Sequence, residues 1–299
     1  MSDWLTSLEG TEAGHWLALG LALQAAFLHA LFGALQKGKT DPWTSRAVID
    51  GSYALIAAPF ALFVVPFPEP HMWRLFAIAW AIHVGYKLMQ GAAYSAGAYT
   101  VVYPVVRGTG PVFTVIGAGI LFGEHFKGLQ WLGVALLVGG ILGYALYNLR
   151  HIVVDRARLP MALGLAVATG GFVALYTTWD AFVIRATADP FTFLAWFFLI
   201  DGIFLPVAWL ALHRGRVPRP FLPLAGLGVT GAVIAYFSFG GIMLATRLDK
   251  VGEAAVLRET SVLFAALIGW LLLREGVGPR RVALMSLIAA GAVLVEWGS

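Results

Sequence analysis

The chain has no cysteine among its 299 residues, and this absence excludes several kinds of chemistry at once. Disulfide bonds, thiolate metal sites and cysteine nucleophiles are impossible, and no redox compartment can be inferred. The sequence also lacks a Walker-type phosphate loop, so we expect no ATP hydrolysis by this chain. Because no Ser-His, His-Asp or metal-ligand cluster occurs at a useful spacing, we expect no hydrolytic site, no metal and no other cofactor.

Charged residues are scarce as well. They make up 12% of the chain, against about a quarter of an ordinary soluble domain. Hydrophobic residues make up 60%. The charged residues are too few to form the surface of a water-soluble protein of this length, so the composition predicts an integral membrane protein. The net charge of +4 does not indicate nucleic acid, because the basic residues flank apolar segments. We expect membrane lipid and a small-molecule substrate as partners.

The first fifteen residues contain three acids and neither Lys nor Arg. A cleavable signal peptide begins with a positively charged region, so we expect the first apolar segment to remain in the mature protein.

Apolar segments long enough to cross a bilayer, which takes about 20 residues, recur along the whole chain. Segments this long and continuous are typical of helices rather than barrel strands. Ten segments qualify: 16–36, 46–66, 72–92, 98–121, 129–149, 161–181, 190–212, 221–246, 251–273 and 281–297.

The second half of the chain repeats the first. An offset of 151 residues relates four pairs of motifs: Arg107-x-Thr109 and Arg258-x-Thr260, Asp50-Gly51 and Asp201-Gly202, Phe113 and Phe264, Gly140 and Gly291. At an offset of 148, KGKTDPWT, which starts at residue 37, corresponds to RATADPFT, which starts at residue 185. The sequence therefore predicts two five-helix repeats, 1–150 and 151–299, that form one membrane domain.

Five helices is an odd number, so the two repeats should lie upside down relative to each other, as in secondary transporters. Most of the Lys and Arg residues lie in the loops after the odd-numbered segments. By the positive-inside rule these loops are cytoplasmic and both termini lie outside.

The stretch YPVVRGTGPVFTVIGAGILFGE (103–124), a glycine-rich fifth helix and the two-copy architecture resemble the drug/metabolite transporter superfamily, in particular its EamA-type ten-helix exporters. The resemblance covers essentially the whole chain, but its motifs identify a superfamily better than a substrate. It implies a basket of ten helices around a central cavity. Many members have both termini in the cytoplasm, contrary to the charge distribution here.

Ionisable residues inside membrane helices face the bundle interior by default. Matched depths along the spans predict two symmetry-related structural ion pairs, Asp50 with Arg107 and Asp201 with Arg258. Direct contact of either arginine with substrate is the alternative, and the two roles are compatible because a guanidinium carries five donors. Glu259 is an extra acid of the second copy, either a salt-bridge partner or a titrating group.

Glycines and prolines surround Arg107 but not Arg258. Gly108 and Gly110 permit close helix approach, and Pro111 removes a backbone hydrogen bond near Arg107. We therefore expect the fourth span to kink there and the ninth span, without these residues, to be straighter.

The third span carries a polar and aromatic stripe at helical spacing, whereas the corresponding span of the second half does not. Such a stripe predicts a cavity with aromatic walls and cationic donors, suited to a small amphipathic molecule with a carboxylate. Core packing or interfacial anchoring is the alternative for its aromatic members. The candidate substrate-binding residues are His83, Lys87, Gln90, Tyr94, Tyr99, Tyr103, Arg107, Trp179, Tyr236, Arg258 and Glu259.

These features favour a secondary transporter in a bacterial inner membrane that exports amino acids or related small metabolites by alternating access. An intramembrane lipid-modifying enzyme and a channel-like facilitator are the alternatives, and the sequence shows neither a catalytic cluster nor a selectivity filter. The oligomeric state does not follow from the sequence, which is compatible with a monomer.

Overall fold

A computed structural model of the chain describes residues 2–35, 41–97, 99–149, 158–215, 221–271 and 278–298. Within these ranges every regular element is a helix and no strand occurs. Seven helical stretches are long and apolar enough to cross a membrane. The prediction of an all-helical integral membrane protein is confirmed, while the count of ten crossings stays a prediction.

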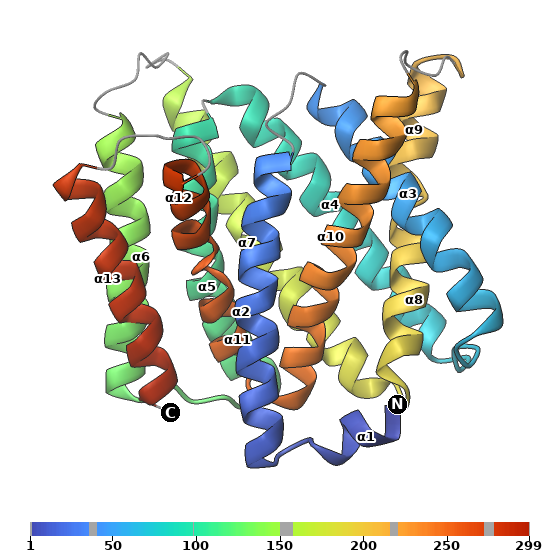
Figure 1. Cartoon of the computed structure of the whole chain (residues 1–299), viewed down its shortest axis with the longest axis horizontal. Coiled ribbons are helices and arrows are strands. Elements are labelled where there is room, and N and C mark those ends of the chain that lie inside the picture. The colour runs from blue at the N-terminus through green and yellow to red at the C-terminus, as the bar shows by residue number, and fades with distance from the viewer. Residues whose placement is uncertain are drawn as a thin grey trace. The chain divides into compact units, whose positions relative to one another are not determined.

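Each of the ten predicted spans is helical in the structure (Figure 1). Eight are single helices, two are divided into two helices each, and a short helix precedes them all. The bounds are α1 Ser2–Ser7, α2 Glu12–Leu35, α3 Pro42–Phe63, α4 Met72–Ala96, α5 Tyr99–Phe122, α6 Gly128–Leu149, α7 Leu159–Ala186, α8 Pro190–Asp201, α9 Phe204–Leu212, α10 Phe221–Leu248, α11 Val251–Arg258, α12 Ser261–Leu271 and α13 Pro279–Trp297.

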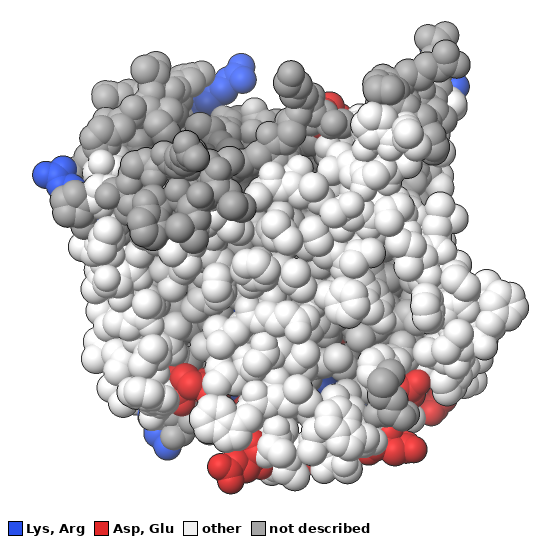
Figure 2. Space-filling model, viewed as in Figure 1, with Lys and Arg blue, Asp and Glu red and all other residues white. Residues whose placement is uncertain are grey.

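The exposed side chains of these helices are suited to lipid. Large apolar residues such as Leu55, Phe63 and Ile120 are 77%, 84% and 82% exposed. Figure 2 shows that Lys, Arg, Asp and Glu are almost absent from the middle of the visible face. In water such a surface would be an aggregation hazard, and in a bilayer it is the expected one.

The described chain forms two compact units. Unit 1 comprises Met1–Val84 and Ala181–Leu248, and unit 2 comprises Gly85–Asp180 and Asp249–Ser299. The divisions fall within α4 and α7 and between α10 and α11, so each unit contains helices from both predicted repeats. The repeat boundaries themselves, 1–150 and 151–299, remain predictions.

In unit 2, the corresponding helices α6 and α13 pack against each other through glycines. A Cβ atom on Gly140 would lie 2.9 Å from the carbonyl oxygen of Leu284, and one on Gly291 would lie 2.5 Å from that of Gly133. The offset of 151 residues converts the first contact into the second. Because residue numbers rise along α6 as they fall along the facing part of α13, the two helices are antiparallel, which supports an inverted duplication.

In unit 1, α3 packs antiparallel to its counterpart, which is α8 followed by α9. Near the start of α3, Thr44 accepts a hydrogen bond from Trp209 Nε1 of α9 (3.0 Å). Beyond the end of α3, the carbonyl of Pro66 accepts one from Thr192 Oγ1 of α8 (3.3 Å). The opposite direction of equivalent elements therefore occurs in unit 1 as well.

The two copies also start these helices in the same way. The carboxylate of Asp41 caps α3 by accepting hydrogen bonds from the Thr44 backbone N–H (2.8 Å) and hydroxyl (2.9 Å). Asp189 caps α8 by accepting from the Phe191 N–H (3.1 Å) and the Thr192 hydroxyl (3.1 Å). In both copies a proline occupies the first turn, where its missing N–H costs nothing. The duplicated Asp-Pro-x-Thr motif is thus a helix start.

The expectation that the ninth span would be straighter than the fourth is wrong. α5 runs without interruption from Tyr99 to Phe122 although it contains Pro104 and Pro111, whereas the ninth span divides at Glu259–Thr260. At the break, Thr260 N–H bonds to the Leu257 carbonyl three residues back (3.0 Å), and its hydroxyl donates to the same carbonyl (2.7 Å). This side-chain bond competes with the regular helical pattern and favours a tight turn.

The seventh span also divides at a buried acid. α8 ends at Asp201, and Gly202 caps it with its N–H directed to the Phe198 carbonyl. A Cβ atom on Gly202 would lie 2.6 Å from the carbonyl oxygen of Asp50, so only glycine lets the break pack against α3 this closely.

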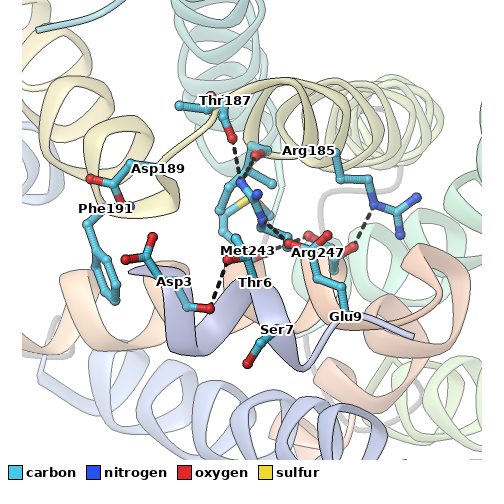
Figure 3. Close-up of polar contacts among 12 residues, drawn as sticks. Asp3, Thr6, Ser7, Glu9, Arg185, Thr187, Asp189, Phe191, Met243 and Arg247 are labelled. Carbon is cyan, nitrogen blue, oxygen red and sulfur yellow. Dashed lines mark hydrogen bonds and ion pairs between the residues drawn. The ribbon is translucent and has the colours of Figure 1, made fainter. Parts of the chain in front are cut away.

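The C-terminal ends of α7 and α10 cap each other in unit 1 (Figure 3). Arg185 Nε of α7 donates to the Thr246 carbonyl (2.9 Å), and Arg247 Nη1 of α10 donates to the carbonyls of Ile184 and Thr187 (2.6 Å each). Arg247 Nε also pairs with Glu9, which follows α1 (2.6 Å). Arginines in the last turn satisfy the orphan carbonyls and suit the negative end of the helix dipole.

Replacing Gly291 by alanine tests the glycine packing of α6 on α13. The added methyl would overlap backbone atoms of Gly133 and Leu137, so we expect a loss of about 1–3 kcal/mol of stability, as overpacking generally costs. Gly139→Ala on α6 is the matched control, because no atom lies within 4 Å of its Cβ position. Thermal melting of both variants in one detergent checks this, and equal melting temperatures would contradict the packing.

Candidate functional site

Arg107 lies in unit 2 on a part of α5 that packs closely on two neighbours. A Cβ atom on Gly108 would lie 2.9 Å from Leu142 of α6, and one on Gly110 would lie 3.2 Å from Val173 of α7. The sequence prediction that these glycines permit close helix approach is confirmed. Larger side chains at these two positions would press on Leu142 and Val173, and Arg107 projects from α5 between these two closely packed faces.

The guanidinium of Arg107 pairs with the carboxylate of Glu259, which caps the C-terminal end of α11. Arg107 Nη1 lies 3.1 Å from Glu259 Oε1 and 3.3 Å from Oε2. Arg258 Nε lies 3.7 Å from the same Oε1 atom. The exposed fractions are 8% for Arg107, 6% for Arg258 and 1% for Glu259. Two buried arginines of unit 2 therefore share one buried carboxylate.

Tyrosines surround this group. The guanidinium of Arg107 lies over the ring of Tyr103, 5.3 Å from its centroid, in the geometry of a cation–π contact. The rings of Tyr86 and Tyr176 meet edge to face at 4.9 Å and lie within electrostatic range of Arg107. Gln90 Nε2 donates to the Tyr86 hydroxyl (2.7 Å). Tyr86, Tyr103 and Tyr176 therefore lie near a buried cation, as the sequence prediction requires, and their contact with substrate stays a prediction.

The predicted stripe on α4 is divided between the units, with Lys87, Gln90 and Tyr94 in unit 2 and His83 in unit 1. Lys87 is buried at 4% exposure, whereas Gln90 and Tyr94 are half-buried. Among the remaining candidates of unit 2, Trp179 of α7 is half-buried. The side chain of Tyr99 lies outside the described residues.

The candidates of unit 1 lie in an aromatic cluster. The His83 ring is 4.8 Å from Phe197 and 5.9 Å from Phe239, and it is 6% exposed. Tyr236 of α10 lies 5.0 Å from the ring of Phe198. These ring contacts are compatible with both roles that the sequence left open for His83 and Tyr236. The two side chains can pack in the protein core or line a cavity.

The two buried aspartates of unit 1 have partners that the sequence prediction did not name. Asp50 Oδ1 lies 2.7 Å from Arg46 Nε, one helical turn earlier on α3. Asp201 Oδ2 accepts a hydrogen bond from the Tyr53 hydroxyl at 2.5 Å. Asp50 and Asp201 are 0% and 4% exposed. Arg46 could have been found from sequence, because residues four apart on a helix are neighbours.

The predicted pairs Asp50–Arg107 and Asp201–Arg258 join residues of different units and stay predictions. Glu259, given as a salt-bridge partner or a titrating group, does pair with both arginines in unit 2.

Glu124, which follows α5, caps the start of α11 in unit 2. Its carboxylate accepts hydrogen bonds from the first backbone N–H groups of α11, at Val251 (2.7 Å) and Gly252 (2.9 Å). Its sequence counterpart Glu275 lies outside the described residues.

A second polar cluster in unit 2 was missed by the sequence analysis. Glu253 is 3% exposed and accepts from Gln130 Nε2 (2.7 Å) and from Lys250 Nζ (2.8 Å). Gln130 also donates to the Val295 carbonyl (3.2 Å), so the cluster ties α6, α11 and α13 together. Its role is structural cross-linking of three helices. In the described part of the chain, no group of three or more His, Asp and Glu side chains could hold a metal ion.

Comparison with known proteins supports the predicted resemblance. Residues 160–297 match the EamA-like transporter family. A solved crystal structure of a protein has the same fold, with a TM-score of 0.75 at 17% sequence identity over 95% of this chain and 96% of the other. No curated protein sequence matches the chain.

Replacing Asp50 by alanine tests the ion pair that its buried carboxylate makes with the partly exposed Arg46 in unit 1. Without the buried carboxylate, Arg46, which is 28% exposed one turn earlier on the same helix, loses this partner, and we expect a loss of about 1.5–3 kcal/mol. Asp41→Ala, which removes only the exposed cap of the same helix, should cost about 1 kcal/mol. Thermal or denaturant unfolding compares the two. If the two variants unfold at the same temperature or denaturant concentration, the Asp50–Arg46 pair does not contribute more stability than the Asp41 cap.

Proposed function

We propose that the chain is a secondary exporter of small molecules. The match of residues 160–297 to the EamA-like transporter family and the seven helices long and apolar enough to cross a membrane, among the described residues, support this proposal. The substrates are amino acids or related small amphipathic metabolites, and the membrane is a bacterial inner membrane. Transport proceeds by alternating access to a binding site that includes candidates of unit 2. One observation supports this best: a buried guanidinium, Arg107, lies against a tyrosine ring and one carboxylate.

The chemistry of this group fits a substrate with an apolar body and a polar end. Tyr86, Tyr103 and Tyr176 offer aromatic faces and hydroxyl groups, and Arg107 and Lys87 offer positive charge. Ionisable groups inside membrane helices are costly, and they typically line substrate or ion pathways. We infer that these side chains contact the substrate during its passage.

Counterflow in proteoliposomes tests the function. Vesicles loaded with one unlabelled amino acid should accumulate the labelled form from outside, and the label should leave the vesicles chemically unchanged. A modified product would support the intramembrane enzyme instead. Uptake of label without stimulation by the unlabelled substrate inside would support a channel.

We predict that Lys87→Ala abolishes counterflow while the protein still folds. Lys87 is buried on α4, and its counterpart at the offset of 151 residues is Ser238. Because the second repeat folds without a cation at this position, we do not expect the fold to require Lys87. Lys127→Ala, at an exposed position of unit 2, is the matched control. Both variants are compared by size-exclusion elution and by initial rates. A Lys87→Ala protein that exchanges substrate at the rate of the control would remove Lys87 from the site.

A further inference from the structure

The single carboxylate of Glu259 does not balance the two arginines around it. Arg107 and Arg258 each carry a positive charge, and both are paired within unit 2 with the single carboxylate of Glu259. All three are at least nine-tenths buried. We call Arg107, Glu259 and Arg258 the arginine triad. Its net charge is +1, and an uncompensated charge away from water is strongly unfavourable.

The hydrogen-bond donors of the triad are also largely unused. Each guanidinium has five N–H groups. Both contacts of Arg107 with the carboxylate involve one nitrogen, Nη1. Among the described residues of unit 2, the Nε and Nη2 atoms of Arg107 have no hydrogen-bond partner, and Arg258 has none for any of its nitrogens. Glu259 therefore does not occupy the two-nitrogen edge that a carboxylate binds best.

The surroundings direct a ligand to that edge. The Arg107 guanidinium lies over the Tyr103 ring, which supplies an apolar surface beside the charged group for the body of a ligand. Arg258 is the last residue of α11 and Glu259 is its cap, so both lie at a helix break inside a predicted span. Ends of discontinuous helices are where membrane transporters bind ions and charged substrate groups.

We propose that the arginine triad binds one carboxylate group of the transported molecule, which brings the site to electrical neutrality. This inference rests on the proposed transport function and narrows its substrates to molecules that carry a free carboxylate. Glu259 balances one arginine in the empty site, and the incoming carboxylate balances the other. A neutral or purely cationic molecule leaves the positive charge uncompensated and binds weakly.

Isothermal titration of the purified full-length protein in detergent tests this with a matched pair of probes. Phenylacetate and phenylacetamide share an aromatic body that suits the tyrosines, and they differ in charge. We expect phenylacetate to bind at least about tenfold more tightly, since a charge-assisted hydrogen bond is about twice as strong as a neutral one. Equal affinities for the two probes would overturn the proposal.

Substitutions then assign the binding to the triad. Arg107→Gln and Arg258→Gln should each weaken phenylacetate binding at least about tenfold. Glu259→Gln removes the competing negative charge and should strengthen it about tenfold. Arg280→Gln, on the exposed side of α13 in the same unit, should change nothing. Unchanged binding in both arginine variants, or weaker binding in Glu259→Gln, would refute the assignment.

Two features keep the result interpretable. Glu259→Gln is a gain-of-binding variant, so a misfolded protein cannot imitate its expected result, and size-exclusion elution identifies any arginine variant that does not fold. Titration measures binding without transport. If phenylacetate binds but no amino acid shows counterflow, the proposed export function is wrong and carboxylate binding by the triad stands. If counterflow occurs but the two probes bind equally, the export function stands and carboxylate binding by the triad is wrong.

Discussion

A charge inside a bilayer needs a partner within the protein, and this requirement shapes both units. In unit 1 the buried carboxylates of Asp50 and Asp201 are held by Arg46 and by the Tyr53 hydroxyl. In unit 2 the carboxylate of Glu259 is held between two arginines. The Tyr53–Asp201 contact joins α3 to a divided span, and the Arg107–Glu259 contact joins α5 to another, whereas Arg46 and Asp50 are both on α3. A residue that turns away from its neighbours would be left in lipid, so the helices must keep these faces together.

Close backbone packing makes these contacts possible. Gly202 lets the break between α8 and α9 reach the backbone of Asp50, and Gly108 and Gly110 let α5 approach α6 and α7. Apolar side chains gain little by leaving lipid for a helix interface, so membrane helices associate through small residues and polar contacts. The Gly133–Gly291 contact and its counterpart at Gly140 show the same solution in both copies.

Hydropathy was enough to predict where the helices lie, because lipid imposes length and composition on every span. The offset of 151 residues was enough to indicate equivalent helices, and α6 and α13 indeed pack antiparallel. The divisions at Asp201 and Glu259 could not be predicted in this way. Thr260 breaks the ninth span through one hydroxyl contact, whereas Pro104 and Pro111, the stronger sequence signals, lie inside an unbroken α5.

The partners of the buried charges were harder to predict for a related reason. The predicted pairs were obtained by counting residues along each span as if the helices were straight. Asp50 and Arg107 were paired because each lies eight or nine residues from one end of its helix. This counting took no account of neighbours on the same helix, where Arg46 precedes Asp50 by one turn. Such counting also does not predict that the ninth span divides at Glu259, where this side chain pairs with Arg107. Sequence patterns specify which residues must avoid lipid, and only tertiary structure specifies which of them meet.

Divergence between the copies explains why the arginine triad is unbalanced. Duplication provides two arginines, Arg107 and Arg258, at equivalent positions. The position after each is Gly108 in one copy and Glu259 in the other. An acid at Gly108 would have to displace the Leu142 side chain, because a Cβ atom there would already lie 2.9 Å from it. The packing of α5 on α6 therefore allows one glutamate for two arginines, and the remaining positive charge requires an anion from elsewhere.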